Sequence, residues 1–174
     1  MFVAHLPAGY LATTALLDRA AMPPSPARRR LLAIGLAASV LPDLDLLWFY
    51  FVDNRQHVHH EFLPHLPLAW AVLAVAAVVL RLRRAGRTAW LALAVLAANV
   101  FLHLALDTVA EGVEWLWPFS SAEFVLSHVK PGHDPWWLNF VLHWTFALEI
   151  ALLTAALVVW RGRRPSGARV PATE

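Results

Sequence analysis

The sequence contains no cysteine, and charged residues make up only 15% of its 174 positions. Without cysteine the chain has no disulfide bond, no thiolate metal ligand and no cysteine nucleophile. Soluble proteins carry about 25% charged residues, so the low charge argues against a soluble fold. The chain also lacks the Gly-x-Ser-x-Gly turn of serine hydrolases, the His-Glu-x-x-His zinc motif and a glycine-rich phosphate loop. Any metal site must therefore be built from histidine, carboxylate and water.

Hydrophobic residues are abundant instead: they form 59% of the chain, with nine Trp, nine Phe and a mean hydropathy of +0.55. Aromatic side chains are typical of proteins that meet the membrane interface. The net charge is only +2 and the basic residues are almost all Arg beside apolar runs, so we do not expect nucleic-acid binding. The first residues lack a basic region and include His5 and Pro7, so we do not expect a cleavable signal peptide.

Four apolar segments are long enough to span or nearly span a bilayer, which takes about 20 helical residues. They are 31–52, 66–82, 88–109 and 137–160. A fifth segment, 5–17, is shorter, and we expect a short tilted span or a half-inserted helix there. The sequence therefore predicts an all-α, polytopic membrane bundle of four to five transmembrane segments. We expect one integral-membrane domain over 1–162 and a disordered basic cytoplasmic tail at 163–174.

The basic residues predict an orientation. Of the 14 Lys and Arg residues, all but Arg55 and Lys130 lie in or beside the first and third connections or after the last segment. The positive-inside rule places Arg-rich connections in the cytoplasm. The N-terminus is then outside, the C-terminus is in the cytoplasm, and all nine histidines fall at or near the extracytoplasmic face.

Two aspartates interrupt the segment 31–52, in the run Leu41-Pro42-Asp43-Leu44-Asp45. A charged residue near the centre of a spanning helix costs about 2.5–3.5 kcal/mol on insertion scales. Pro42 removes a backbone donor, so we expect the helix to kink or break there. The carboxylates would then line a pocket and bind a cation. Alternatively, the span ends near Val40 and the aspartates form a hydrated cap.

Four histidines follow within nine residues, at positions 57, 59, 60 and 65. The zinc motif of metalloproteases needs two histidines four residues apart on a helix. Here His60 and His65 are five apart, and Pro64 would disrupt a helix between them. We expect a loop or helix start that offers two imidazoles. The alternative is a pH-sensitive or adventitious metal-binding tract.

Asn99, His103 and Asp107 recur every four residues, which places them on one stripe of a helix. A histidine and a carboxylate one turn apart can bind one metal, or the carboxylate can orient the imidazole. A structural hydrogen bond between packed helices is the bland alternative. We expect Glu111 and Glu114 to be solvated. The sequence assigns no role to His57, His59, His128, His133, His143 and Glu149.

Taken in order, these motifs resemble the YdjM-like family of bacterial inner-membrane, metal-dependent hydrolases. The shared features are His5, LPDLD at 41–45, HEFLPH at 60–65, HLALD at 103–107, Gly112 and the run Leu116-Trp117-Pro118. The match covers roughly the first two-thirds of the chain. Family members carry Arg-Gly after the first His of the second motif and Thr before its last His, where this chain has Glu61-Phe62 and Pro64. The pattern is also loosely similar to zinc-dependent phospholipase C and nuclease enzymes.

The resemblance implies a membrane-bound hydrolase with the metal ligands His5, Asp43, Asp45, His60, His65, His103 and Asp107. It makes Asp43, Asp45, His103 and Asp107 the catalytic candidates. Seven ligands exceed what one catalytic zinc takes from a protein, so we expect one to three divalent ions, with Zn²⁺ favoured. Membrane lipids are the expected partners, and a lipid or another phosphoester is the expected substrate. The alternatives are a metal-binding or transport protein and a structural membrane subunit.

Overall fold

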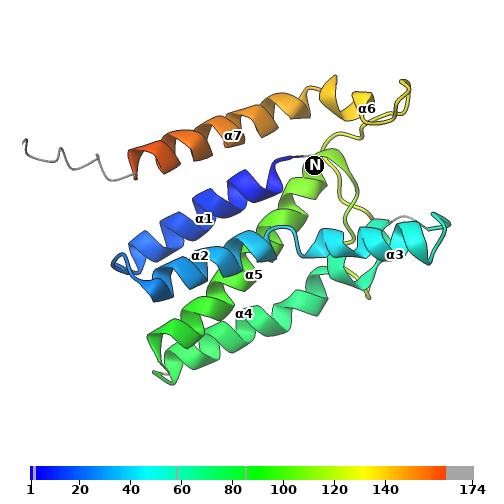
Figure 1. Ribbon diagram of the computed structural model, residues 1–174. Helices are drawn as coiled ribbons and strands as arrows, with labels where there is room; N and C mark the ends of the chain where they lie inside the picture. The colour runs from blue at the N-terminus through cyan, green and yellow to red at the C-terminus, as the bar shows by residue number, and fades with distance from the viewer. Residues whose placement is uncertain (2, 58, 85, 164–174) are drawn as a thin grey trace, which may run out of the picture.

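The computed structural model describes residues 1, 3–57, 59–84 and 86–163, and within them it is built of helices (Figure 1). The longer helices are α1 (His5–Arg19), α2 (Pro26–Ala38), α4 (Pro67–Leu82), α5 (Arg87–Ala110) and α7 (Thr145–Gly162). Short ones are η1 (Pro42–Leu44), α3 (Asp45–Phe51), η2 (His59–Glu61), η3 (Leu63–His65) and α6 (Leu138–Val141). The predicted all-α class is therefore confirmed. Residues 164–174 of the predicted tail lie outside the described residues.

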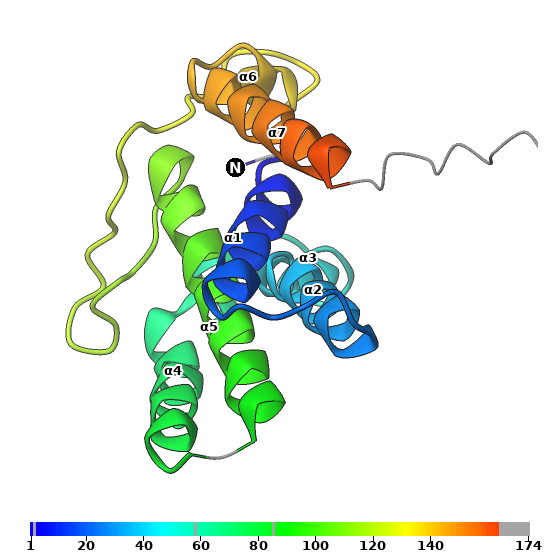
Figure 2. The same ribbon diagram turned by 90° about the vertical axis from the view of Figure 1, so that its left-hand side faces the viewer.

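Helix α5 is the centre of the bundle, and α1, α2 and α4 pack against it, while α7 packs on α1 (Figure 2). One apolar cluster, Leu17, Leu31, Leu91 and Val95, joins α1, α2 and α5 in the half of the bundle nearest the α1–α2 turn. Proline at the start of α2 and of α4 is well placed, because the first turn of a helix needs no donor there. Ser25 caps α2 by accepting a hydrogen bond from the Arg28 backbone N–H.

The two ends of the bundle differ in charge. The α1–α2 turn, the α4–α5 turn and the end of α7 lie together at one end, and the arginines gather on these connections (Figure 1). There Asp18 accepts hydrogen bonds from Arg28 and Arg163, which ties α1 to α2 and to the end of α7. Met1, α3 and α6 lie at the other end. The Arg-rich connections therefore lie at one end of the bundle, as the sequence predicts.

The predicted count of four to five spans is not confirmed. Among the described residues, α5 and α7 are long and apolar enough to cross a membrane, and α2 with 42–51 makes a third candidate that is bent by 55°. Helix α4 is apolar but has 16 residues. The bend follows the break that Pro42 predicts. The segment 137–160 is also divided, into α6 and α7, which the sequence does not predict.

Two glycines allow α1, α2 and α5 to approach closely. A Cβ on Gly9 would lie 2.5 Å from the Ser39 Cβ and 3.0 Å from the Asn99 Oδ1, and one on Gly35 would lie 2.0 Å from the Thr13 Oγ1. Small residues of this kind let helix backbones pack tightly in membranes. The hydrogen bond from the Asn99 amide to the Thr13 hydroxyl (2.8 Å) then closes the contact between α1 and α5.

We expect Gly9→Ala to destabilise the protein by about 1–3 kcal/mol, because the new methyl group overlaps Ser39 and forces α1 and α2 apart. Thermal unfolding of the purified protein in detergent measures this as a lower midpoint. Gly86→Ala is the matched control, since its Cβ meets nothing within 4 Å. Equal unfolding midpoints for Gly9→Ala and Gly86→Ala would contradict the close packing of α1 against Ser39.

Candidate metal centre

Histidine and aspartate side chains from four parts of the chain converge at the end of the bundle opposite the arginines. Six of the seven residues implied by the sequence form two groups, and within each group one ligand atom per residue lies within 4.8 Å of the others. The first group is His5, Asp43 and His103, and the second is His60, His65 and Asp107. Each group offers two imidazoles and one carboxylate. Five of these side chains are buried, and Asp43 is 31% exposed.

The local sequence explains this convergence. His103 and Asp107 lie one turn apart on α5, and Nε2 of the first is 3.0 Å from Oδ2 of the second. The break at Pro42 turns the chain into η1, which brings Asp43 over the same face of α5. Two successive one-turn helices, η2 and η3, supply His60 and His65. His60 and His65, five residues apart, therefore lie on two successive short helices and not on one α-helix, as the predicted loop or helix start allows.

Asp107 lies between the two groups. Its Oδ1 is 3.2 Å from Nε2 of His5, and its Oδ2 is 3.0, 3.8 and 4.0 Å from Nε2 of His103, His65 and His60. The ammonium group of Met1 lies 2.6 Å from Oδ1, so positive charge is already drawn to this carboxylate. Asp107 therefore lies near histidines of both groups and would be a ligand shared by ions held in them.

Asp43 has a similar position at the edge of the site. Its Oδ1 is 3.5 Å from Nε2 of His103, in the first group, and 3.9 Å from Nε2 of His65, in the second. The two imidazole nitrogens are themselves 3.4 Å apart. Because the groups touch through these atoms, they form one centre, and each group could hold a metal ion.

The hydrogen bonds of the imidazoles decide what the centre can bind. Each of three rings has its Nδ1 on an oxygen that can only accept: His103 on the Ser39 carbonyl (2.8 Å), His60 on the Gly112 carbonyl (3.1 Å) and His65 on the Asp45 carboxylate (2.6 Å). In the neutral ring Nδ1 would therefore carry the proton, and Nε2 would present a lone pair. These lone pairs point toward Asp107 Oδ2, a buried oxygen that accepts no hydrogen bond from the described residues. Converging lone pairs and carboxylate oxygens repel one another unless a cation lies between them, so the donor set fits divalent metal ions.

Asp45 has a different position from the other implied ligands. Its carboxylate contacts Nδ1 of His65 on the side away from the centre, and it belongs to neither group of ligand atoms. A carboxylate behind a metal-binding imidazole fixes the ring orientation and makes Nε2 more basic. The position of Asp45 suits it to orient His65 if that ring binds a metal, and its predicted role as a ligand stays a prediction.

We expect Asp45→Asn to weaken metal binding by roughly 10- to 100-fold, because His65 loses the anionic partner that aligns it. Metal titration of the purified protein by calorimetry measures the change. Asp53→Asn is a matched control, since Asp53 makes the same 2.6 Å contact with Nδ1 of His57 in an outer loop. An unchanged affinity in Asp45→Asn would remove the proposed role.

The remaining histidines lie outside the two groups. His57 is exposed and pairs with Asp53, and this hydrogen bond raises the pKa of His57 and lowers the pKa of Asp53. His133 contacts Asn139, and His143 contacts Thr145, so Asn139 and His143 bond to local neighbours instead of completing the centre. His128 is exposed in the same region. The side chain of His59 lies outside the described residues.

The structure adds residues that the sequence did not single out. Glu111, expected to be solvated, has an oxygen 3.4 Å from Nε2 of His60 and is 29% exposed. Its position continues the stripe of Asn99, His103 and Asp107 by four residues, a signal that the sequence does contain. Glu149, to which the sequence assigns no role, is buried and accepts a hydrogen bond from the Val3 backbone N–H. It thereby anchors the segment that leads to His5.

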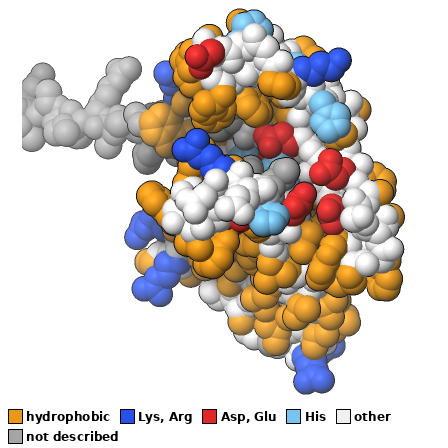
Figure 3. Space-filling model, turned by 90° about the vertical axis from the view of Figure 1, so that its right-hand side faces the viewer, with side chains coloured by type: hydrophobic (Ala, Val, Ile, Leu, Met, Phe, Trp, Pro, Cys, Tyr) orange, Lys and Arg blue, Asp and Glu red, His pale blue; other side chains and the backbone are white. Residues whose placement is uncertain are grey.

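A pocket of about 320 Å³ leads to the centre from outside. Its polar lining includes Asp43, His60, Asp107 and Glu111, and its other walls are largely apolar. On this face of the molecule, acidic and histidine side chains gather around a hollow (Figure 3). A small molecule can therefore reach the candidate metal ligands without any movement of the bundle.

The fold and the site define a helical membrane protein with a buried His/Asp centre at one end of its bundle. The family model described as YdjM inner membrane protein matches residues 1–167, so the chain belongs to the YdjM inner membrane protein family. Family membership and the apolar helices together establish a membrane location. No match was found among curated proteins or among solved structures.

Proposed function

We propose that the protein is a membrane-bound, metal-dependent hydrolase that holds two divalent ions, most suitably Zn²⁺, in the two groups of ligands. The observation that supports this most strongly is the convergence of imidazole lone pairs, each fixed by an acceptor on Nδ1, around the buried oxygen of Asp107. Neighbouring ligand groups that share carboxylates and face a pocket fit the two-metal sites of phosphatases and nucleases.

Bound ions would supply a hydroxide nucleophile at neutral pH and would polarise the scissile group. The protein's own contribution is to hold the donors in place. Ser39, Gly112 and Asp45 fix three imidazoles from behind, and Asp43 and Asp107 place oxygens between the groups. The aromatic walls of the pocket reduce access of bulk water on the remaining side.

The proposed substrate is a phosphoester, either a lipid or another ester near the membrane surface, because the pocket opens at the end of a membrane bundle. The test is hydrolysis of bis(p-nitrophenyl) phosphate by the purified full-length protein. We expect activity that disappears after treatment with a chelator and returns with Zn²⁺. Protein that binds metal stoichiometrically but cleaves neither this ester nor phospholipids would contradict the proposal.

We propose that the metal centre faces the extracytoplasmic side, with the N-terminus outside and the C-terminus in the cytoplasm. Support comes from the arginines, which gather at the opposite end of the bundle. Because the chain has no cysteine, single cysteines can be introduced at Ser121, in the exposed loop between α5 and α6, and at Gly86, in the α4–α5 turn. In intact spheroplasts a membrane-impermeant maleimide should label the first and not the second. The reverse pattern would invert the orientation.

Metal transport through the bundle is the alternative, and the packing argues against it. The polar contact between Thr13 and Asn99 lies one turn below His103. Beyond it the apolar cluster of Leu17, Leu31, Leu91 and Val95 fills the bundle. A cation would have to cross this cluster without polar ligands, at a high desolvation cost.

A further inference from the structure

We propose, on the basis of the proposed function, that the pocket beside the metal centre binds a membrane amphiphile with an anionic phosphoester headgroup. In this arrangement the headgroup lies against Asp43, His60 and Asp107 with their ions, and the apolar chain lies between α3 and α6. The proposal names the substrate class of the same site and makes the surrounding bilayer its source.

The lining of the pocket has two chemical parts. The deep part presents the metal-ligand candidates Asp43, His60 and Asp107. The outer part is apolar and aromatic, with Leu46 and Phe49 from α3 and with Trp136 and Phe140 in and just before α6. A water-soluble phosphoester without an apolar group would bury no apolar surface against these walls. An amphiphile matches both parts, because burying an apolar chain there removes its surface from water.

The outer surfaces of the same two elements point to the bilayer. Helix α3 exposes Leu47, Trp48 and Phe51 on its other faces, and Phe51 is 79% exposed. Leu142 and Trp144 are exposed beside α6. Short helices with exposed aromatic and aliphatic side chains lie in the membrane interface. The mouth of the pocket is therefore flanked by two elements that meet lipid, so an amphiphile can enter from the bilayer.

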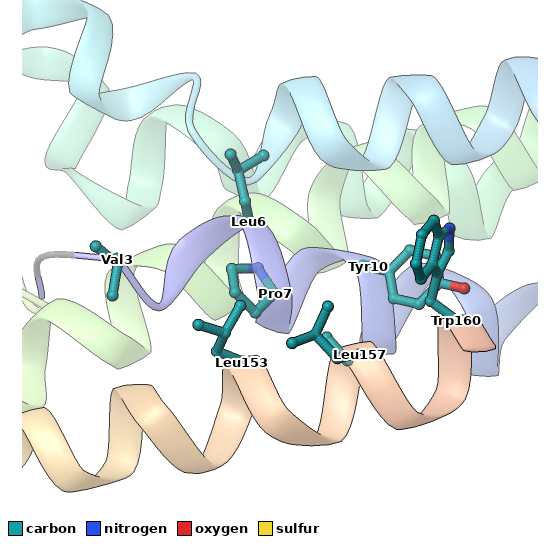
Figure 4. A pocket seen from close by; sticks show the side chains of 8 residues that line it. Val3, Leu6, Pro7, Tyr10, Leu153, Leu157 and Trp160 are labelled. Atoms are coloured by element: carbon teal, nitrogen blue, oxygen red, sulfur yellow. The ribbon is translucent and has the colours of Figure 1, made fainter. Parts of the chain in front are cut away.

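A second apolar pocket, between α1 and α7, provides an internal comparison (Figure 4). It measures about 400 Å³, and Leu6, Pro7, Leu153 and Leu157 lie along it. Among the described residues no charged side chain lines it, so this lining can hold an acyl chain of any lipid but offers no charge to select a headgroup. Binding that depends on the headgroup should therefore appear at the α3–α6 pocket and be absent from the α1–α7 pocket.

The test uses photo-crosslinking in lipid nanodiscs loaded with Zn²⁺. The probe is a hexadecylphosphonate with a diazirine in its chain, and the comparison probe is the corresponding hexadecanol. We expect the phosphonate to label residues 45–51 and 136–141, and the alcohol to label the α1–α7 pocket at least as strongly. Leu46→Trp, which fills the pocket, should lower the phosphonate labelling by about 10-fold. Leu47→Trp, on the adjacent exposed position, should leave it unchanged.

Equal labelling in the two tryptophan variants, or labelling by both probes at the α1–α7 pocket alone, would overturn the proposal. Both variants should retain the metal content of the native protein, which shows that they fold. Turnover gives a second readout: Leu46→Trp should lower kcat/KM for a long-chain phospholipid by about 10-fold, and Leu47→Trp should leave kcat/KM unchanged for this lipid and for bis(p-nitrophenyl) phosphate. If the native protein binds metal and the phosphonate but cleaves neither ester, the hydrolase proposal fails while amphiphile binding stands.

Discussion

Replacing His103 by alanine is expected to reduce the bound metal from about two ions per chain to one or none, and to lower hydrolysis by roughly a thousand-fold. His103 contacts several of the other candidate ligands. Its Nε2 lies 3.0 Å from Asp107, 3.5 Å from Asp43 and 3.4 Å from Nε2 of His65. Its ring also stacks on His5 at 3.9 Å. Alanine removes a direct ligand of the first group and the packing that supports its neighbour.

Metal analysis of the purified variant and its rate on bis(p-nitrophenyl) phosphate measure the two effects. His128→Ala is the matched control, because His128 is exposed and outside both groups. His103→Gln, which keeps most of the volume, separates the loss of the ligand from the loss of packing. A His103→Ala protein that folds and retains the native metal content would contradict the assignment of His103 as a ligand.

Asp107→Asn is expected to have an equal or larger effect, with less than one ion bound per chain and a comparable loss of hydrolysis. The substitution keeps the size of the side chain but removes the negative charge that faces both groups. It also replaces one oxygen by an amide N–H₂, which cannot coordinate a cation. Since Asp107 Oδ2 approaches His103 and His65 while Oδ1 approaches His5, either orientation of the amide loses one side of the bridge.

Asp18→Asn is the control for this charge change, because Asp18 is exposed at the opposite end of the bundle and pairs with arginines. Metal content by elemental analysis and thermal unfolding with and without Zn²⁺ are the measurements. The native protein should gain stability from added Zn²⁺, and Asp107→Asn should not. If Asp107→Asn binds two ions as the native protein does, the bridging role is wrong.

Much of the centre could be predicted from the sequence because its ligands follow local rules. The stripe of His103 and Asp107 is a matter of helix periodicity, and the break that places Asp43 follows from Pro42. What the sequence could not supply are the partners of the imidazoles. The carbonyls of Ser39 and Gly112 reach His103 and His60 across 64 and 52 residues, and such pairings depend on tertiary packing. The contact between Asp45 and Nδ1 of His65 is also tertiary, so the sequence alone could not distinguish Asp45 from the residues whose ligand atoms form the two groups.

The fold shows the same division between local and tertiary signals. Long apolar runs predict helices, and the structure confirms them. Hydropathy averages over breaks, however, so it does not reveal that 137–160 divides into α6 and α7 at residues 142–144. No proline marks that break, whereas Pro42 marks the one before α3. The number of spans therefore depends on bends that composition alone does not reveal.

The most direct test of the central claim is elemental analysis of the full-length protein, purified in detergent without chelators and titrated with Zn²⁺. We expect saturation at about two ions per chain in the native protein. We expect about one ion or fewer in His103→Ala and an unchanged metal content in His128→Ala. A folded native protein that binds no divalent ion, or binding that His103→Ala leaves intact, would contradict the claim that these histidines and aspartates form a metal centre.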